Sequence, residues 1–267
     1  MRLVEVRDAT FFYGAQEVFT HISFHVGPGE VFCLLGPNGC GKTTLLDCIL
    51  GLHHLHSGSI LIGGKDAESY RPGKIARQIA YVPQRHEPTF PYTVREIVTM
   101  GRAAYLRLFE SPSAADRRMA DEALEHIGIA HLRNRPYTQL SGGETQMVMI
   151  ARALVQHTPV VILDEPTAHL DFRYELVILE VIAGMVKEKG LSIIMATHSP
   201  NHALHFHDNG INTTVAMFHK GAFFAVGNPE SVLNEDNLKH LYGVKARVIT
   251  LDEEGRIMKQ VVPLKTM

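Results

Sequence analysis

Several features that would assign the chain to other protein classes are absent or scarce. The sequence has no tryptophan and only three cysteines, Cys33, Cys40 and Cys48, which form neither an even disulfide framework nor a CxxC metal pair. Cysteines without a disulfide framework or a metal-binding pair are typical of proteins in a reducing, cytosol-like compartment. No apolar run reaches the roughly 18–20 residues that a membrane-spanning helix needs. Charged residues from position 2 onward also interrupt the N-terminal segment too early for a signal peptide.

The chain also lacks an excess of charge of either sign. Its 26 Lys and Arg residues nearly balance 28 Asp and Glu residues, which gives a formal net charge of -2. Proteins that bind nucleic acid by neutralising phosphates are usually basic, so we expect no nucleic-acid partner. The composition, 45% hydrophobic and 20% charged over 267 residues, is that of a globular protein with a large core. Any membrane role is therefore expected to be peripheral.

What is present is an alternation of strand and helix patterns. Residues 3–13 and a second strand pair over 18–26 alternate apolar and polar positions. The apolar run 31–35, typical of a strand buried on both faces, leads into a glycine-rich loop and a helical pattern over 42–52. Further buried strands are predicted at 160–163 and 192–196, on either side of a helix over 173–189. This order indicates an α/β fold.

The middle of the chain has a different character. Strand signals become rare over 88–140, where helices are predicted at 94–101 and 114–127. We interpret this segment as a helical subdomain inserted into a catalytic core formed by 1–87 and 141–240. The end of the chain, 241–267, is predicted to be a β-hairpin extension. Its strands lie within 246–263 and its turn comprises Asp252, Glu253, Glu254 and Gly255.

The glycine-rich loop matches the phosphate-binding pattern G-x-x-x-x-G-K-[ST] without a mismatch. It consists of Gly36, Pro37, Asn38, Gly39, Cys40, Gly41, Lys42 and Thr43, and Thr44 follows it. Glycines let backbone N–H groups surround phosphate oxygens at a helix N-terminus. We expect Lys42 to reach the β- and γ-phosphates of ATP and Thr43 to ligate Mg²⁺.

Two carboxylates follow the strand predicted at 160–163. Burying Asp164 and Glu165 without partners would cost several kcal/mol, so their position predicts a cation nearby. We expect Asp164 to contact Mg²⁺ through water and Glu165 to act as the base that polarises the attacking water.

Between these two motifs stands Leu140-Ser141-Gly142-Gly143-Glu144. This stretch resembles the LSGGQ signature of the ABC ATPases, with Glu144 in place of the usual glutamine. A Ser-Gly-Gly sequence that opens a helix offers a second anion-binding nest. The resemblance implies an ABC ATPase fold: a P-loop NTPase (RecA-like) core with an antiparallel β subdomain and an inserted α-helical subdomain.

The resemblance extends along nearly the whole chain, because the other family motifs follow in order. Gln84 resembles the Q-loop glutamine, which contacts Mg²⁺ and senses the membrane subunit. His198 resembles the H-loop histidine, which contacts the γ-phosphate. Asp171 ends a stretch similar to the D-loop, although Ala-His replaces the usual Ser-Ala pair before its leucine. Tyr13 resembles the aromatic residue that stacks on adenine.

The family resemblance also implies partners. Two copies would dimerise head to tail around two Mg·ATP, each site combining Lys42, Asp164, Glu165 and His198 of one chain with Ser141 of the other. The pair would work at the cytoplasmic face of the membrane on separate permease subunits, and indirectly with a substrate-binding protein. The permease is expected to dock on the segment 84–102, which includes Pro88, Phe90, Pro91 and Tyr92.

Three functional classes of ABC ATPase share these motifs: transport subunits, DNA-repair and chromosome-structure ATPases, and translation factors. DNA-repair and chromosome-structure members carry long coiled coils between the phosphate loop and the signature, whereas here about a hundred residues without a heptad run separate them. Translation factors carry two cassettes, and this chain has one. A transport ATPase is therefore predicted.

The cargo is less well specified. The segment 93–102 and the tail Leu241-Tyr242-Gly243-Val244 resemble importers of iron–siderophore, haem and cobalamin-type metal chelates. Molybdate or tungstate importers and zinc or manganese importers remain alternatives.

Two histidine clusters and one cysteine stand near these motifs. His53, His54 and His56, and likewise His202, His205 and His207, lack a standard metal pattern, so we expect solvated or helix-capping side chains. Cys40 is interpreted as a small residue at an unconstrained loop position. A redox role for it would require a lowered thiol pKa.

Overall fold

A six-stranded sheet in the order β10-β9-β3-β8-β7-β6 forms the centre of the molecule. The structure, a computed structural model, describes residues 2–84, 86, 90–107, 109–253 and 256–267. The parallel strands are β3 (Glu30–Leu35), β6 (Ile79–Val82), β7 (Val160–Asp164), β8 (Ser192–Thr197) and β9 (Asn212–His219), and β10 (Ala222–Gly227) is antiparallel. Every residue of β3, β7 and β8 is buried, so the predicted α/β core is confirmed.

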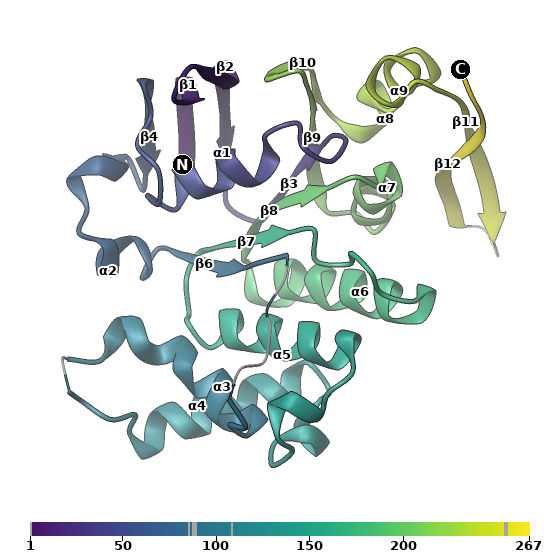
Figure 1. Ribbon diagram of the computed structural model, residues 1–267. Helices are drawn as coiled ribbons and strands as arrows, with labels where there is room; N and C mark the ends of the chain where they lie inside the picture. The colour runs from purple at the N-terminus through teal and green to yellow at the C-terminus, as the bar shows by residue number, and fades with distance from the viewer. Residues whose placement is uncertain (1, 85, 87–89, 108, 254–255) are drawn as a thin grey trace.

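An antiparallel sheet lies above the central one and encloses α1 (Lys42–Ile49) between the two layers (Figure 1). Its strands are β1 (Val4–Tyr13), β2 (Gln16–Val26), β4 (Ser57–Ile62) and β5 (Lys65–Asp66), in the order β2-β1-β4-β5. The strand pair predicted over 18–26 is instead one long strand, β2, which pairs with β1 across a tight turn at Gly14. The helix predicted over 42–52 ends earlier because Gly51, at φ 73°, leaves the helical region.

The opposite face of the central sheet is covered by helices. α5 (Gly142–Leu154), α6 (Phe172–Lys189) and α7 (Pro200–Asp208) pack there. Alternate residues of β3 divide between the two layers: Phe32 and Leu34 join α1 and the antiparallel sheet, whereas Val31, Cys33 and Leu35 join the helical side. The alternation of side chains along a strand thus connects both cores to one sheet.

The helical part of the chain lies at the far end of the molecule (Figure 1). It contains α3 (Val94–Thr99), the 3₁₀ turn η2 (Met100–Tyr105), α4 (Ala114–His126), η3 (Ala130–Leu132) and η4 (Tyr137–Gln139). Both predicted helices are present, but the one predicted over 94–101 changes to 3₁₀ geometry after Thr99. At Gly101 an added Cβ would lie 2.2 Å from the Arg152 carbonyl oxygen, so this turn packs directly on the backbone of α5.

The chain ends beside α7. Here α8 (Pro229–Val232) and α9 (Glu235–Tyr242) precede the hairpin of β11 (Val244–Glu253) and β12 (Arg256–Thr266). The predicted hairpin is confirmed and is longer than 246–263, while Glu254 and Gly255 of the predicted turn lie outside the described residues. The short elements η1 (Ala67–Ser69) and α2 (Pro72–Ile75) connect β5 to β6. Among the helices that the structure describes, none has both the length and the apolar character needed to cross a bilayer.

Candidate functional site

The predicted motifs follow the carboxyl ends of four neighbouring parallel strands. The phosphate-loop motif follows β3 and His198 follows β8. Asp164 is the last residue of β7 and Glu165 follows it, and Gln84 comes shortly after β6. Because β3, β8, β7 and β6 are adjacent in this order, their ends form one continuous edge. Open α/β sheets bind ligands at this edge.

Lys42 connects the phosphate loop to β7. Its side chain is buried, and Nζ donates to the carbonyl oxygens of Gly36 at 2.8 Å and Pro37 at 3.1 Å. The same Nζ lies 3.2 Å from Glu165 Oε1. Gly36 lets the phosphate loop pack directly on the backbone of Phe218, because a Cβ at this position would lie 2.5 Å from the Phe218 carbonyl oxygen.

The N-terminus of α1 carries no side-chain cap. Its N-cap residue is Gly41, at φ 107°, and no side-chain hydrogen bond closes the first turn. The N-termini of α3, α4 and α5 each carry a complete capping box instead. A helix N-terminus leaves backbone N–H groups without intrahelical partners and carries partial positive charge. The first turn of α1 is therefore available to an anion such as phosphate.

Asp164 and Thr43 form the second part of the site. Thr43 Oγ1 donates to Asp164 Oδ2 at 2.8 Å. Asp164 is buried, and its Oδ1 has no hydrogen-bond partner among the described residues. Burial raises the pKa of this carboxyl group above its usual range. A hydroxyl next to an unsatisfied carboxylate oxygen offers the hard oxygen ligands that Mg²⁺ prefers, so these residues fit that ion.

Glu165 lies between Lys42 and His198. Its Oε2 is 2.6 Å from His198 Nδ1, and its Oε1 faces Lys42. Burial alone would raise the pKa of Glu165, but the hydrogen bond with His198 and the charge of Lys42 outweigh it and hold the pKa below its usual range. The same hydrogen bond raises the pKa of His198. Glu165 also has φ 48°, a strained conformation of the kind found at functional sites.

Lys42, Thr43 and Glu165 line a cavity of about 430 Å³, whereas Asp164 and His198 are not among its lining residues. Its lining includes nine of the predicted site residues: Tyr13, Asn38, Gly39, Gly41, Lys42, Thr43, Thr44, Gln84 and Glu165. Tyr13 stands on its rim, 49% exposed, with its hydroxyl 3.0 Å from His53 Nε2. Gln16 and Val18 also line the cavity, and the sequence analysis missed them. The signal was the tight turn at Gly14, which places Gln16 opposite Tyr13 across the β1–β2 pair.

The signature and D-loop residues lie elsewhere. Ser141, Gly142 and Gly143 begin α5, and neither they nor Asp171 line the cavity. The N-terminus of α5 holds its own carboxylate: Glu144 Oε2 accepts from the Ser141 backbone N–H at 2.8 Å. Asp171 caps α6 by accepting from the Tyr174 backbone N–H.

Three expectations about nearby residues need correction or comment. His202 is neither solvated nor a cap, because its side chain is only 2% exposed and lies between α6 and α7. His53 and His56 pack edge to face or tilted against Phe11. Burial raises, rather than lowers, the pKa of Cys40, which removes the argument for a redox-active thiolate.

The segment predicted to meet the permease is divided between surface and core. Phe90 and Tyr92 are 62% and 44% exposed, and their ring centroids lie 6.0 Å apart. Val94 and Val98 are fully buried in the helical part. Pro88 lies outside the described residues.

Fold and site together define a P-loop ATPase. The chain belongs to the ABC transporter family, whose sequence model matches residues 19–168. It is therefore an ATP-binding protein and an ATPase coupled to transport, as the family resemblance implied.

Relatives of known sequence cover almost the whole chain. An uncharacterised ABC transporter ATP-binding protein of Haemophilus influenzae is 38% identical over 97% of this chain and 96% of its own length. The molybdate import ATP-binding protein MolC of the same organism is 31% identical, over 90% and 88%. The iron(3+)-hydroxamate import ATP-binding protein FhuC of Bacillus subtilis is 34% identical, over 89% and 87%.

A solved structure supports the same fold. A chain of a transporter described as metal-chelate type, in an inward-facing conformation, is 30% identical and superposes with a TM-score of 0.87. The match covers 99% of this chain and 98% of that one. The predicted ABC ATPase fold is thereby confirmed.

The contact between Glu165 and His198 predicts the titration of the histidine. In the nucleotide-free protein, the pKa of His198 should lie above its ordinary value of 6.5, because the carboxylate stabilises the protonated ring. Glu165→Gln should lower that pKa, since a neutral amide no longer favours the cation. NMR titration of the His198 ring measures both values, and unchanged titration of the other histidines is the control. A His198 pKa that is insensitive to Glu165→Gln would contradict the contact.

Proposed function

We propose that this chain binds Mg·ATP in the cavity at the strand ends, hydrolyses it as a head-to-tail homodimer, and powers an importer of metal chelates. In this proposal, residues 1–87 and 141–240 form the catalytic core, 88–140 the helical subdomain and 241–267 a C-terminal extension. The observation that carries the proposal is the cluster of Lys42, Glu165 and His198 beside the uncapped N-terminus of α1.

The proposed role of each residue combines its contacts with the family resemblance. Lys42 and the first turn of α1 bind the phosphates, and Tyr13 stacks on the base. Glu165 is the base, because Lys42 and His198 keep its carboxylate ionised and able to accept a proton from water. His198 contacts the γ-phosphate, and Asp171 of the D-loop acts near the nucleotide of the dimer.

Thr43, Asp164 and Gln84 are the residues that would hold Mg²⁺. When bound, the ion would neutralise charge on the phosphates during transfer. The unsatisfied Oδ1 of Asp164 and the adjacent Thr43 hydroxyl supply the oxygen donors for this role.

A second copy is needed to complete the site. Ser141 and Gly142 are exposed, and both lie outside the cavity that Lys42 lines. If these residues bind phosphate, as the signature resemblance implies, the ATP is held by another chain. Glu144 accepts a hydrogen bond from the Ser141 backbone N–H at the N-terminus of α5, so its carboxylate would lie beside the partner's nucleotide in the dimer.

Complementation between two inactive variants tests the shared site. Ser141→Arg should retain ATP binding and lose ATPase activity, because bulk and charge replace the contact to the partner's γ-phosphate. Lys42→Ala should lose activity in its own pocket. A mixture of the two should regain part of the activity, since one of the two sites in a mixed dimer is intact. If the mixture stays inactive although subunit exchange is demonstrated, two copies do not share a site.

The location follows from the partner. The chain would act peripherally at the cytoplasmic face of the membrane, bound to permease subunits that work with a substrate-binding protein. The exposed rings of Phe90 and Tyr92, within the segment 84–102, offer the permease an apolar contact. Aromatic anchors of this kind often dominate protein–protein contacts.

Two observations favour a metal-chelate cargo. The FhuC relative is an iron(3+)-hydroxamate import ATP-binding protein, and the solved structure that covers 99% of this chain comes from a transporter described as metal-chelate type. Molybdate is the second candidate, because MolC is 31% identical over 90% of this chain. Zinc or manganese import is a third alternative from the sequence.

The cargo is tested with the assembled transporter. The chain is reconstituted in nanodiscs with the permease and binding protein encoded beside it, and the binding protein is offered ferric hydroxamate, haemin, cobalamin or molybdate. We expect one of the metal chelates to stimulate ATP hydrolysis above the level of the unloaded binding protein. Stimulation by molybdate alone would replace the metal-chelate proposal with the second candidate.

A further inference from the structure

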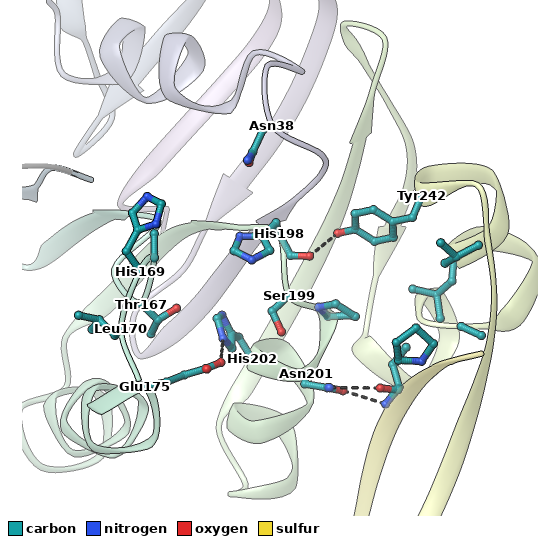
Figure 2. Close-up of a pocket in the computed structure, with 17 residues that line it drawn as sticks. Asn38, Thr167, His169, Leu170, Glu175, His198, Ser199, Asn201, His202 and Tyr242 are labelled. Carbon is teal, nitrogen blue, oxygen red and sulfur yellow. Dashed lines mark hydrogen bonds and ion pairs between the residues drawn. The ribbon is translucent and has the colours of Figure 1, made fainter. Parts of the chain in front are cut away.

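The backbone of His198 is held by the last residue of α9. The Tyr242 hydroxyl donates to the His198 carbonyl oxygen at 2.7 Å. Figure 2 shows this contact crossing from the C-terminal part of the chain to the strand end that carries His198. A residue of the C-terminal extension therefore touches the same histidine whose ring contacts Glu165.

The last residue of β8, Thr197, precedes His198 and is held by a contact with His202 of α7. Thr197 is buried, and its Oγ1 lies 2.8 Å from His202 Nδ1 while accepting from the Ser199 backbone N–H at 3.1 Å. His202 Nε2 lies 2.8 Å from Glu175 Oε1 on α6 (Figure 2). The carboxylate can only accept, so Nε2 donates to Glu175, while Nδ1 of the same ring lies against the Thr197 hydroxyl.

The C-terminal extension is anchored to α7 near the same place. Asn201 donates through Nδ2 to the Val261 carbonyl oxygen at 3.2 Å and accepts from the Val261 N–H at 2.8 Å. The amide thus pairs with β12 as a neighbouring strand would. Asp208 accepts from the Lys259 N–H at 2.7 Å at the other end of α7. The hairpin, α7 and the 197–199 turn are consequently connected by direct hydrogen bonds.

We propose that Tyr242 and His202 are positioning residues that hold His198 in register with Glu165, so that the C-terminal extension contributes to ATP hydrolysis. Tyr242 fixes the carbonyl group of His198, and His202 fixes the turn through Thr197. Glu175 lies one turn beyond Asp171 on α6, so the His202 contact also connects the D-loop helix to the His198 turn. This inference rests on the proposed role of His198 in hydrolysis.

Two conservative variants test it, each with a matched control. Tyr242→Phe removes one hydroxyl, and its control is Tyr105→Phe, because the Tyr105 hydroxyl also donates to a backbone carbonyl, that of Gln156. Thr197→Val is matched by Thr213→Val, because Thr213 is also a buried threonine with a hydrogen-bonded hydroxyl, which donates to the Ile211 carbonyl oxygen. Loss of a positioning hydrogen bond should lower kcat about threefold to tenfold. The KM and Kd for ATP should stay constant, and the controls should keep the normal kcat.

A double-mutant cycle separates positioning from general stability. In a His198→Ala background, Tyr242→Phe and Thr197→Val should cause no further loss, because there is no ring left to position. The inference is overturned if both variants behave like their controls, or if their losses persist unchanged in the His198→Ala background. If His198→Ala alone keeps the normal rate, the proposed role of His198 fails first, and the positioning role fails with it.

Discussion

Two adjacent buried carboxylates at the end of β7 are the constraint on which the site depends. Moving an ionised carboxylate out of water costs on the order of several kcal/mol, and here two follow each other in the chain. The cost is offset by groups from other strand ends: Lys42 and Thr43 beyond β3, and His198 beyond β8. The parallel order β3-β8-β7 brings these groups together, so the sheet topology is what places compensating groups beside the two buried carboxylates.

The same constraint explains why the surrounding backbone is so specific. Glu165 adopts φ 48° to place its side chain between Lys42 and His198, and Gly36 leaves no room for a Cβ beside Phe218. Such strain persists only when neighbouring contacts determine the geometry. Tyr242 and the Thr197–His202–Glu175 contacts belong to this surrounding structure, as does the hairpin anchored on α7.

The local parts of the site could be predicted from the sequence. The phosphate loop and the acidic end of β7 are short motifs in which neighbouring residues and a buried strand specify the geometry. His198 was identified through its resemblance to the H-loop histidine of the family. The predicted strand at 31–35 and the helix at 173–189 were close to β3 and α6 for the same reason. The contacts that the analysis missed join distant segments: Tyr242 reaches His198 across 44 positions, and His202 reaches Glu175 across 27. Periodicity carries no information about such pairs. His202 was misjudged because its polar partners, Thr197 and Glu175, lie in other elements, although Ala203, Leu204 and Phe206 beside it are apolar and buried.

The assignment of Glu165 as the base can be tested by replacing its carboxylate with an amide. The measurement is ATP binding and single-turnover hydrolysis by the Glu165→Gln variant under identical conditions. We predict unchanged binding, because the phosphate contacts come from Lys42 and the first turn of α1. Hydrolysis should be slowed about 10²–10⁴-fold through loss of the base. Hydrolysis at a near-normal rate would contradict this assignment, because it would show that the buried Glu165 carboxylate is not the base.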